Sequence, residues 1–509
     1  MTTSAPSRIA LSLISHTNVG KTALARTLLG RDVGEVRDEA HVTATADRYP
    51  MVESQAGDVL ALWDTPGFGD SARLARRLAA LDKPILGFLA MTWDRFRDRA
   101  LWSSQQAVRN VRDEADVVLY LVNAAEMPGD AGYVEPELTI LAWIGKPVIV
   151  LLNQTGPPRG AAHEAAEVAR WRDALGPQPL IRGVLSLDAF ARCWVQEGTL
   201  LREVAKALPA DKQEAFARLA AAWQHKRRRQ FDDAMAAIAE PIARAACDRV
   251  AMPQAGFRGS LVEAGKAIGL GAGRDDSVKA EAMRTLSARL DADIRASTDR
   301  LIALHELDGR AAAEVTARLL ENVTAETPVH EGKAAVIGGF VSGALTGLAA
   351  DLASGGLTFG AGLLAGGVVG AVGAAGLARG FNLVRGRTGT TIRWSDEFVA
   401  TLVPAAILRY LAVAHYGRGR GEWAAGEYPP FWRDEVVAAI AREGGVATEL
   451  AMRADESCNI QSLAVAWRAK LGAVALATLA ALYPDALPLA RGSTDNEAGG
   501  NGAGAADTA

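Results

Sequence analysis

Short, continuous apolar runs alternate with helix-length amphipathic segments over about the first 205 residues of the chain. Runs typical of buried parallel strands lie at residues 9–14, 59–63, 147–152 and 180–185. The segments between them place apolar residues at helical spacing. This alternation predicts an α/β domain, in which a parallel sheet carries helices on both faces.

After residue 205 the pattern becomes helical, which predicts an all-α C-terminal region. Phe216, Leu219 and Trp223 fall on one face of a long helix over 211–250. Further helices are predicted at 277–323, 394–416, 434–443 and 462–482. We interpret the basic run 225–229 as the solvated face of a helix, with contact to anionic lipid or RNA as the alternative.

A block with a single charged residue, Asp351, occupies positions 334–378. Glycine recurs every four residues in both halves, at Gly339, Gly343, Gly347, Gly362, Gly366 and Gly370. That spacing lets two helices approach closely and predicts a Gly-zipper hairpin. Basic residues on both sides favour a hairpin that enters the inner face of a membrane and returns. Because Gly and Ala are weakly hydrophobic, a buried hairpin in a soluble protein is the alternative.

These patterns divide the chain into five predicted parts. They are an α/β domain at 1–205 with a helical insertion at about 70–112, a helical domain at 206–330, the Gly-rich hydrophobic hairpin at 331–390, C-terminal helices at 391–488 and a disordered tail at 489–509. The insertion either responds to what the α/β domain binds or only packs on its sheet.

The first candidate for chemistry directly follows the first strand. Residues 15–22 read Ser-His-Thr-Asn-Val-Gly-Lys-Thr and lead into a helix-like segment, which is the context that a phosphate-binding loop requires. Backbone N–H groups and the helix N-terminus there favour phosphate oxygens. We expect Lys21 to reach the β- and γ-phosphates and Thr22 to bind Mg²⁺. Ser15 replaces the first glycine of the motif, so a polar turn with a chance Gly-Lys-Thr is the alternative.

A second motif, Asp-Thr-Pro-Gly, occupies residues 64–67 after the strand at 59–63. In P-loop proteins such an aspartate holds the Mg²⁺ shell, and the glycine can offer its N–H to the γ-phosphate. We assign these roles to Asp64 and Gly67. Phe68 stands where Ras-type GTPases have a water-orienting Gln, so hydrolysis would need a catalytic element from elsewhere.

Together, residues 18–22 and 64–67 resemble the Era/TrmE-like branch of bacterial GTPases. The resemblance implies GTP as substrate, Mg²⁺ as cofactor, and a switch I threonine that closes over both. We favour Thr45 for that threonine, with Thr43 second. It also implies that Asn18 helps to hold K⁺ in place of an arginine finger, in a site that a G-domain homodimer completes. A role for Asn18 as a loop or helix cap is the alternative.

The resemblance also implies that Lys21, Thr45 and Gly67 act in catalysis, and it implies a set of nucleotide-binding residues. The set is Thr17, Asn18, Val19, Gly20, Lys21, Thr22, Ala23, Asp64, Thr65, Gly67, Asn153 and Ser186.

The base-reading motif departs from the family pattern. In guanine-specific GTPases the strand that corresponds to residues 147–152 is followed by Asn-Lys-x-Asp. The carboxylate of that Asp accepts hydrogen bonds from guanine N1 and N2. Residues 153–156 read Asn-Gln-Thr-Gly, so the Lys and Asp are missing. The loss should cost about 1–3 kcal/mol of guanine discrimination. With the Gly-rich C-terminal stretch, the chain resembles a bacterial family in which an Era-like G domain precedes a domain of unknown function.

Composition narrows the classes of partner. The 509 residues include 49% hydrophobic and 22% charged residues, which is typical of a globular protein of several domains. A net charge of -4 argues against DNA and disfavours RNA or the ribosome. We expect the three cysteines, Cys193, Cys247 and Cys458, to be isolated from one another. With the polar N-terminus, this predicts a cytoplasmic location. If the hairpin inserts, the protein would be peripheral at the inner membrane. The competing functions are a non-catalytic nucleotide-binding scaffold and a ribosome-associated GTPase.

Overall fold

The computed structural model describes residues 6–33, 46–90, 98–156, 159–252, 272–307, 381–386, 389–417, 429–453 and 458–486. The chain forms two compact units. The first combines Met1–Arg228 with His415–Trp423 and Leu479–Ala509, and the second combines Arg229–Ala414 with Ala424–Thr478. The predicted hairpin at 334–378 lies outside the described residues.

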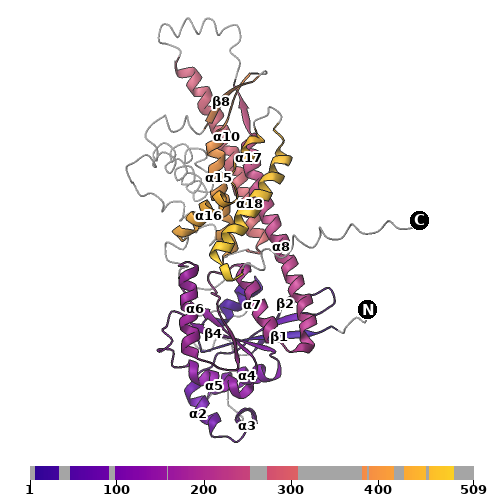
Figure 1. Ribbon diagram of the computed structural model, residues 1–509, viewed down its shortest axis with the longest axis vertical. Helices are drawn as coiled ribbons and strands as arrows, with labels where there is room; N and C mark the ends of the chain where they lie inside the picture. Colours follow the sequence, from indigo (N-terminus) through magenta and orange to yellow (C-terminus); the bar gives the residue numbers. More distant parts are fainter. Residues whose placement is uncertain are drawn as a thin grey trace, which may run out of the picture. The chain divides into compact units, whose positions relative to one another are not determined.

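A six-stranded sheet in the order β2-β3-β1-β4-β5-β6 forms the centre of the first unit (Figure 1). Only β2 is antiparallel to its neighbour. The carboxyl ends of the five parallel strands therefore lie at one edge, where ligands bind in such sheets. The strands are β1 (Arg8–Ser15), β2 (Asp47–Glu53), β3 (Val59–Asp64), β4 (Val117–Asn123), β5 (Val148–Asn153) and β6 (Ile181–Ser186).

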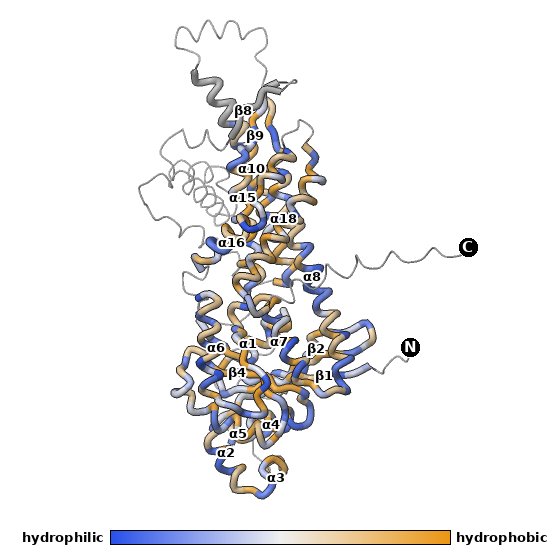
Figure 2. The backbone as a smooth tube through the Cα atoms, in the orientation of Figure 1, coloured by the Kyte–Doolittle hydropathy of each residue, from blue (hydrophilic) through white to orange (hydrophobic). Residues whose placement is uncertain are grey.

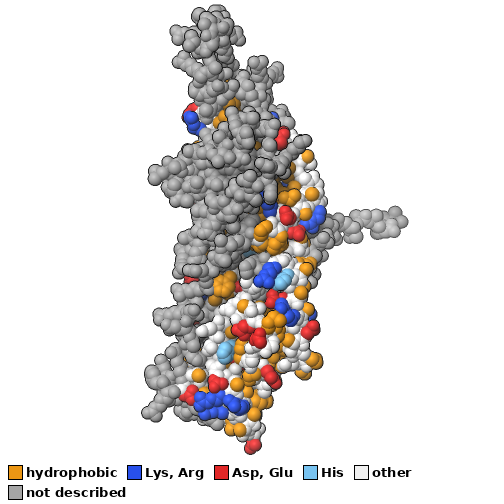
Figure 3. Space-filling model, turned by 90° about the vertical axis from the view of Figure 1, so that its left-hand side faces the viewer, with side chains coloured by type: hydrophobic (Ala, Val, Ile, Leu, Met, Phe, Trp, Pro, Cys, Tyr) orange, Lys and Arg blue, Asp and Glu red, His pale blue; other side chains and the backbone are white. Residues whose placement is uncertain are grey.

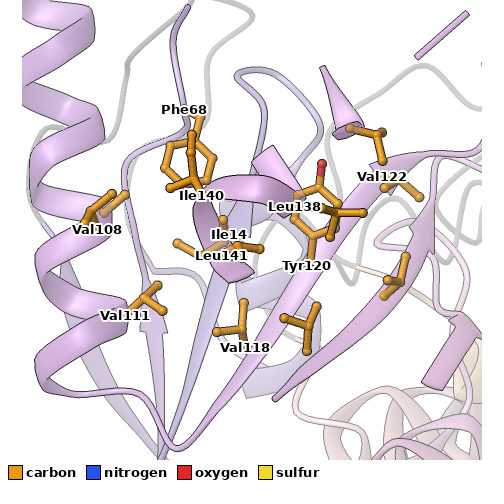
Figure 4. Close-up of a cluster of buried hydrophobic side chains, with 14 of the residues drawn as sticks. Ile14, Phe68, Val108, Val111, Val118, Tyr120, Val122, Leu138, Ile140 and Leu141 are labelled. Carbon is orange, nitrogen blue, oxygen red and sulfur yellow. The ribbon is translucent and has the colours of Figure 1, made fainter. Parts of the chain in front are cut away.

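Helices cover both faces of this sheet, which confirms the predicted α/β fold. One face carries α2 (Ser71–Ala79), α3 (Pro84–Ala90), α4 (Arg99–Asp113), α5 (Val134–Ile144) and α6 (Ala161–Leu175). The other carries α1 (Lys21–Leu29), α7 (Trp194–Ala207) and the first part of α8 (Ala210–Cys247). Figure 4 shows Val108 and Val111 of α4 beside Val118 and Tyr120 of β4. The central strands are accordingly apolar along their length (Figure 2).

The predicted helical insertion contributes α2, α3 and α4 to the first of these faces. Leu74 and Leu78 of α2 are fully buried, whereas its arginines, Arg73, Arg76 and Arg77, are exposed. A group of basic side chains is visible at the height of α2 on the face in Figure 3. Packing on the sheet is thus seen, and a response to bound nucleotide stays a prediction.

The second unit is mainly helical, as predicted for the C-terminal region. Its helices are α10 (Ala272–Leu304), α15 (Asp396–Ala414), α16 (Pro430–Arg442), α17 (Ala447–Ala451) and, in large part, α8 and α18 (Ile460–Leu482). It also contains an antiparallel sheet in the order β7-β9-β8, which the sequence pattern did not predict. The strands are β7 (Arg249–Ala251), β8 (Phe381–Gly386) and β9 (Gly389–Trp394), of which the three-residue β7 is too short to show an alternation.

In the described part of the chain, α15 and α18 have the length and apolar composition that would allow them to cross a bilayer. About half of α15 is already buried within the protein, and core helices of soluble proteins have the same character. This feature therefore adds little to the membrane prediction.

Two of the three cysteines form a disulfide, so the expectation that all three are isolated is wrong. Cys247 ends α8, and its partner Cys458 lies just before α18, 211 residues further along the chain. So large a separation gives no sequence signal. Cys193 is buried and free.

A fully buried arginine, Arg453, holds part of the second unit together. It is 1% exposed. Its guanidinium donates to the Ala246 carbonyl at 3.0 Å, to the Trp394 carbonyl at 2.6 Å and to the Asp396 carboxylate at 2.7 Å. One side chain thus satisfies the last turn of α8 and the end of β9.

Replacement Arg453→Leu is expected to lower the free energy of unfolding by about 2–4 kcal/mol, because it leaves two buried carbonyls without a donor. Chemical denaturation of the full chain measures this loss. Asp396→Asn is the matched control and should cost less than about 1 kcal/mol, since the Asp396 side chain is 51% exposed. Equal losses for the two variants would contradict the assignment to the carbonyls.

Candidate nucleotide site

The candidate phosphate loop joins β1 to α1 at the carboxyl edge of the sheet. Gly20 adopts a φ of 92°, and a Cβ there would lie 2.7 Å from the Asn153 Nδ2, so only glycine fits. Asn18 is exposed and adopts a left-handed φ of 64°. Gly20 is the N-cap of α1 and no side chain caps the helix. The alternative in which Asn18 caps α1 is therefore not seen.

Lys21 and Thr22 begin α1 and are both largely buried. The Lys21 ammonium donates to the Ser15 hydroxyl at 3.0 Å and to the His16 carbonyl at 3.4 Å. Ser15, which replaces a motif glycine, therefore provides an oxygen that holds the lysine. Burial lowers the pKa of Lys21, an effect that the nearby carboxylates of Asp64 and Glu137 oppose.

Asp64 meets this pair from the end of β3. Its Oδ2 accepts a 2.6 Å hydrogen bond from the Thr22 hydroxyl, while its buried Oδ1 has no partner among the described residues. Asp64 is 2% exposed, and burial raises its pKa to about 6. A buried carboxylate oxygen without a donor, beside a hydroxyl, is a donor set that suits Mg²⁺. Thr22 and Asp64 thus fit the predicted metal, whereas Thr43 and Thr45 lie outside the described residues.

The segment after Asp64 runs alongside the phosphate loop. Phe68 N donates to the Ser15 carbonyl at 2.9 Å, and Thr17 N donates to the Phe68 carbonyl at 3.2 Å. A Cβ on Gly67 would lie 2.9 Å from the Lys21 Nζ and 3.1 Å from the Thr17 Cα, so a side chain there would displace the lysine or crowd the loop. The loop and the glycine expected to contact the γ-phosphate are therefore adjacent.

Two neighbours of Gly67 point away from the phosphate loop. The fully buried Thr65 hydroxyl donates to the Leu13 carbonyl at 2.5 Å, which is a structural contact within the sheet. Phe68 is fully buried among the apolar side chains of Figure 4, near Ile140 and Val108. A buried phenyl ring at this position cannot orient an attacking water.

The contacts of His16 could not be predicted from the local sequence pattern. Its Nδ1 lies 2.9 Å from the Glu137 Oε1, and its ring stacks on Tyr133 with centroids 4.8 Å apart. The Tyr120 hydroxyl donates to the other oxygen of Glu137 at 2.9 Å. His16 is thus held by a carboxylate and an aromatic ring. A glutamate on the apolar face of α5 was the available signal, because such a carboxylate needs a partner.

The candidate base loop follows β5 and begins with the fully buried Asn153. The Asn153 amide donates to the Val19 carbonyl at 2.7 Å and accepts from Ala189 N at 2.8 Å. The Gln154 amide, in place of the family lysine, lies 3.4 Å from the Asn18 carbonyl. Ser186 ends β6 in register with Leu152 of β5. The structure therefore brings Asn153 and Val19 into direct contact and places Ser186 on the neighbouring strand.

Asp188, which the sequence analysis did not select, lies in the loop after β6 and contacts the base loop. Its Oδ2 accepts from Thr155 N at 2.7 Å and from the Thr155 hydroxyl at 2.9 Å. Its Oδ1 accepts from Phe190 N at 2.7 Å. Asp188 is 5% exposed, and burial raises its pKa while these three donors oppose the shift.

Comparison with known families separates the two parts of the chain. Residues 178–438, slightly more than half of the chain, match the family described as a domain of unknown function (DUF3482). The chain belongs to the DUF3482 family. Residues 11–154 of this DUF3482 protein match the family described as 50S ribosome-binding GTPase, which covers the site from Thr17 to Asn153. The N-terminal domain is thus a P-loop GTPase domain, a finding that supports GTP binding and the use of Mg²⁺.

Solved structures of Era are also similar to this DUF3482 chain. An Aquifex aeolicus Era variant bound to GDP and AlF4⁻ is 19% identical with a TM-score of 0.29, over 40% of this chain and 57% of that chain. Era in complex with MgGDPNP and nucleotides of 16S ribosomal RNA is 19% identical with a TM-score of 0.28, over 40% and 58%. The chain thus spans less than two thirds of either Era chain. No curated protein matches it.

Removing the Asp64 charge should stabilise the nucleotide-free and metal-free protein. The folded-state pKa of about 6 lies above the ordinary value of 3.8, so ionised Asp64 destabilises the fold above about pH 6 and not below about pH 4. Asp64→Asn is expected to raise the free energy of unfolding by about 2–3 kcal/mol at pH 8, with no difference at pH 4. Denaturation in EDTA at both pH values measures this effect.

The exposed Asp82 supplies the control for this measurement. Asp82→Asn should change the free energy of unfolding by less than about 0.5 kcal/mol at either pH. Equal stability of the wild type and Asp64→Asn at pH 8 would show that the carboxylate is not desolvated.

Proposed function

We propose that this protein hydrolyses GTP to GDP and phosphate and acts as a nucleotide-dependent switch for its helical region. The observation that carries the proposal is the cluster of Lys21, Thr22 and Asp64, in which a buried carboxylate oxygen has no donor among the described residues. A purely structural loop would not keep this unpaired charge, because it costs stability.

Each residue has a role in the attack of water on the γ-phosphorus, which breaks the bond to the bridging oxygen and releases phosphate. Lys21 offsets the negative charge that spreads over the phosphate oxygens. Thr22 and Asp64, with Thr45 of switch I, would hold Mg²⁺, which supplies further positive charge to those oxygens. The Gly67 N–H would bind the γ-phosphate.

The element that replaces the missing Gln is proposed to be K⁺ held by Asn18. Asn18 lies in the phosphate loop, is exposed and has a left-handed φ of 64°, and it does not cap α1. A second G domain across the nucleotide would complete the ion's surroundings. This proposal leaves Phe68 in the core, where the structure places it.

Other functions have weaker support. The matched family name suggests the ribosome as a partner, but a net charge of -4 does not favour RNA. Membrane association rests on the pattern at 334–378 and stays a prediction, which flotation of the full chain with anionic vesicles would test. A non-catalytic scaffold would bind nucleotide without turnover.

Phosphate release from GTP in KCl and in NaCl tests the hydrolase. We expect turnover that is about tenfold faster in KCl, that falls at least about 100-fold in Lys21→Ala, and that loses its K⁺ dependence in Asn18→Ala. The chloride salts at equal ionic strength are the matched controls. Absence of turnover in both salts would contradict hydrolysis, and equal rates in both would contradict the role of Asn18 alone.

A further inference from the structure

At the position where guanine-specific GTPases have the base-reading aspartate, this chain has no carboxylate. Gly156 occupies the position of the family aspartate with a φ of 76°, and a Cβ there would meet none of the described residues within 4 Å. Neither Gln154 nor Thr155 can supply a carboxylate. If the site reads guanine, its acceptor must come from another loop.

Asp188 brings a carboxylate to this loop from the end of β6. Both of its hydrogen bonds to Thr155 involve the residue directly before Gly156. The bond from Ala189 N to the Asn153 amide fixes the loop that carries Asp188, at 2.8 Å. The carboxylate is thus held between the two loops that, by resemblance, frame the base.

The chemistry of this carboxylate suits guanine. Its two oxygens offer about four acceptor positions, of which the described donors take three, one on Oδ1 and two on Oδ2. Rotation of the Thr155 hydroxyl would free a position on Oδ2, so that each oxygen has one to offer. Guanine presents two adjacent donors, N1–H and N2–H, whereas adenine presents an acceptor at N1 and no 2-amino group.

We propose that Asp188 is the residue that selects guanine, by accepting hydrogen bonds from N1–H and N2–H in place of the missing aspartate. The inference rests on the proposed function, since it requires the triphosphate to occupy the loop at Lys21. Burial of the carboxylate strengthens the selection, because a base that fails to donate leaves a charge without its partners.

The test compares the affinities of the full-length wild type and Asp188→Asn for four triphosphates: GTP, ITP, ATP and XTP. The wild type should bind GTP about tenfold more tightly than ITP, which lacks the 2-amino group. Asp188→Asn should bind GTP about 10- to 100-fold more weakly and XTP more tightly by a similar factor. The reversal follows because an amide N–H donates to the xanthine 2-oxo group, which a carboxylate repels.

Glu164 provides a matched control. It lies in the first turn of α6, close enough for the charge of Asp188 to help burial raise its pKa to about 7. Glu164→Gln removes a neighbouring charge and should leave the ratios among the four affinities unchanged. A guanine-to-xanthine switch in this variant, or an equal loss for all four nucleotides in Asp188→Asn, would overturn the assignment to Asp188.

The wild type alone keeps the proposal testable if Asp188→Asn does not fold. Equal binding of GTP and ITP, or of GTP and ATP, would overturn guanine selection by a carboxylate while the hydrolase proposal stands. Failure to bind any of the four triphosphates would instead overturn the proposed function itself.

Discussion

The candidate site depends on the hydrogen bonds that the buried amide of Asn153 makes. This amide donates to the Val19 carbonyl of the phosphate loop and accepts from Ala189 N of the loop after β6. It also lies where a side chain on Gly20 would project, which makes glycine necessary there. A single side chain at the end of β5 therefore sets the positions of the phosphate loop, the base loop and the loop that carries Asp188. These hydrogen bonds are present although the lysine and aspartate of the family's base motif are missing.

The site also concentrates buried charge, which opposes stability. Burial disfavours the ionised forms of Lys21, Asp64 and Glu137, as the directions of their pKa shifts indicate. Their mutual attraction compensates only in part, and hydrogen bonds from His16 and Tyr120 support the Glu137 charge. Such an arrangement is typical of a site that completes its charge balance by binding a polyphosphate and a cation. Burial of apolar side chains in the surrounding sheet offsets this loss of stability.

Local pattern was sufficient to predict four of the parallel strands, β1, β3, β5 and β6, and the motif residues at their ends, because buried parallel strands are continuous apolar runs. It did not single out β4 or the antiparallel β2. Contacts between distant segments were not accessible in this way. The hydrogen bond between His16 and Glu137 spans 121 residues. In the basic run at 225–229, Arg227 pairs with the fully buried Glu197 at 2.9 Å, so this side chain is not simply solvated. Sequence alone shows that a residue is charged but not which buried partner it meets.

Two further contacts within the first unit join the GTPase domain to segments that are distant in the sequence. At one edge of the first unit, Arg218 of α8 donates to both oxygens of Asp58 in the β2–β3 turn, at 2.7 and 3.0 Å. This pair holds the pKa of Asp58 well below its usual range. Strand β2 directly follows the predicted switch I, and α8 continues beyond Arg228 into the second unit.

The other contact lies beside the base loop. The residues after Asp188 bond to a segment that directly follows α15, with Arg192 N 3.2 Å from the His415 carbonyl and Gly417 N 3.0 Å from the Phe190 carbonyl. The loop proposed to read the base is thus hydrogen-bonded to a segment that directly follows α15, whereas Arg218 holds the end of β2 that lies away from the predicted switch I. A change in the base loop on nucleotide binding must therefore be accommodated by the bonds to residues 415 and 417 or transmitted through them. That constraint gives the proposed switch one physical route, through backbone hydrogen bonds within the first unit.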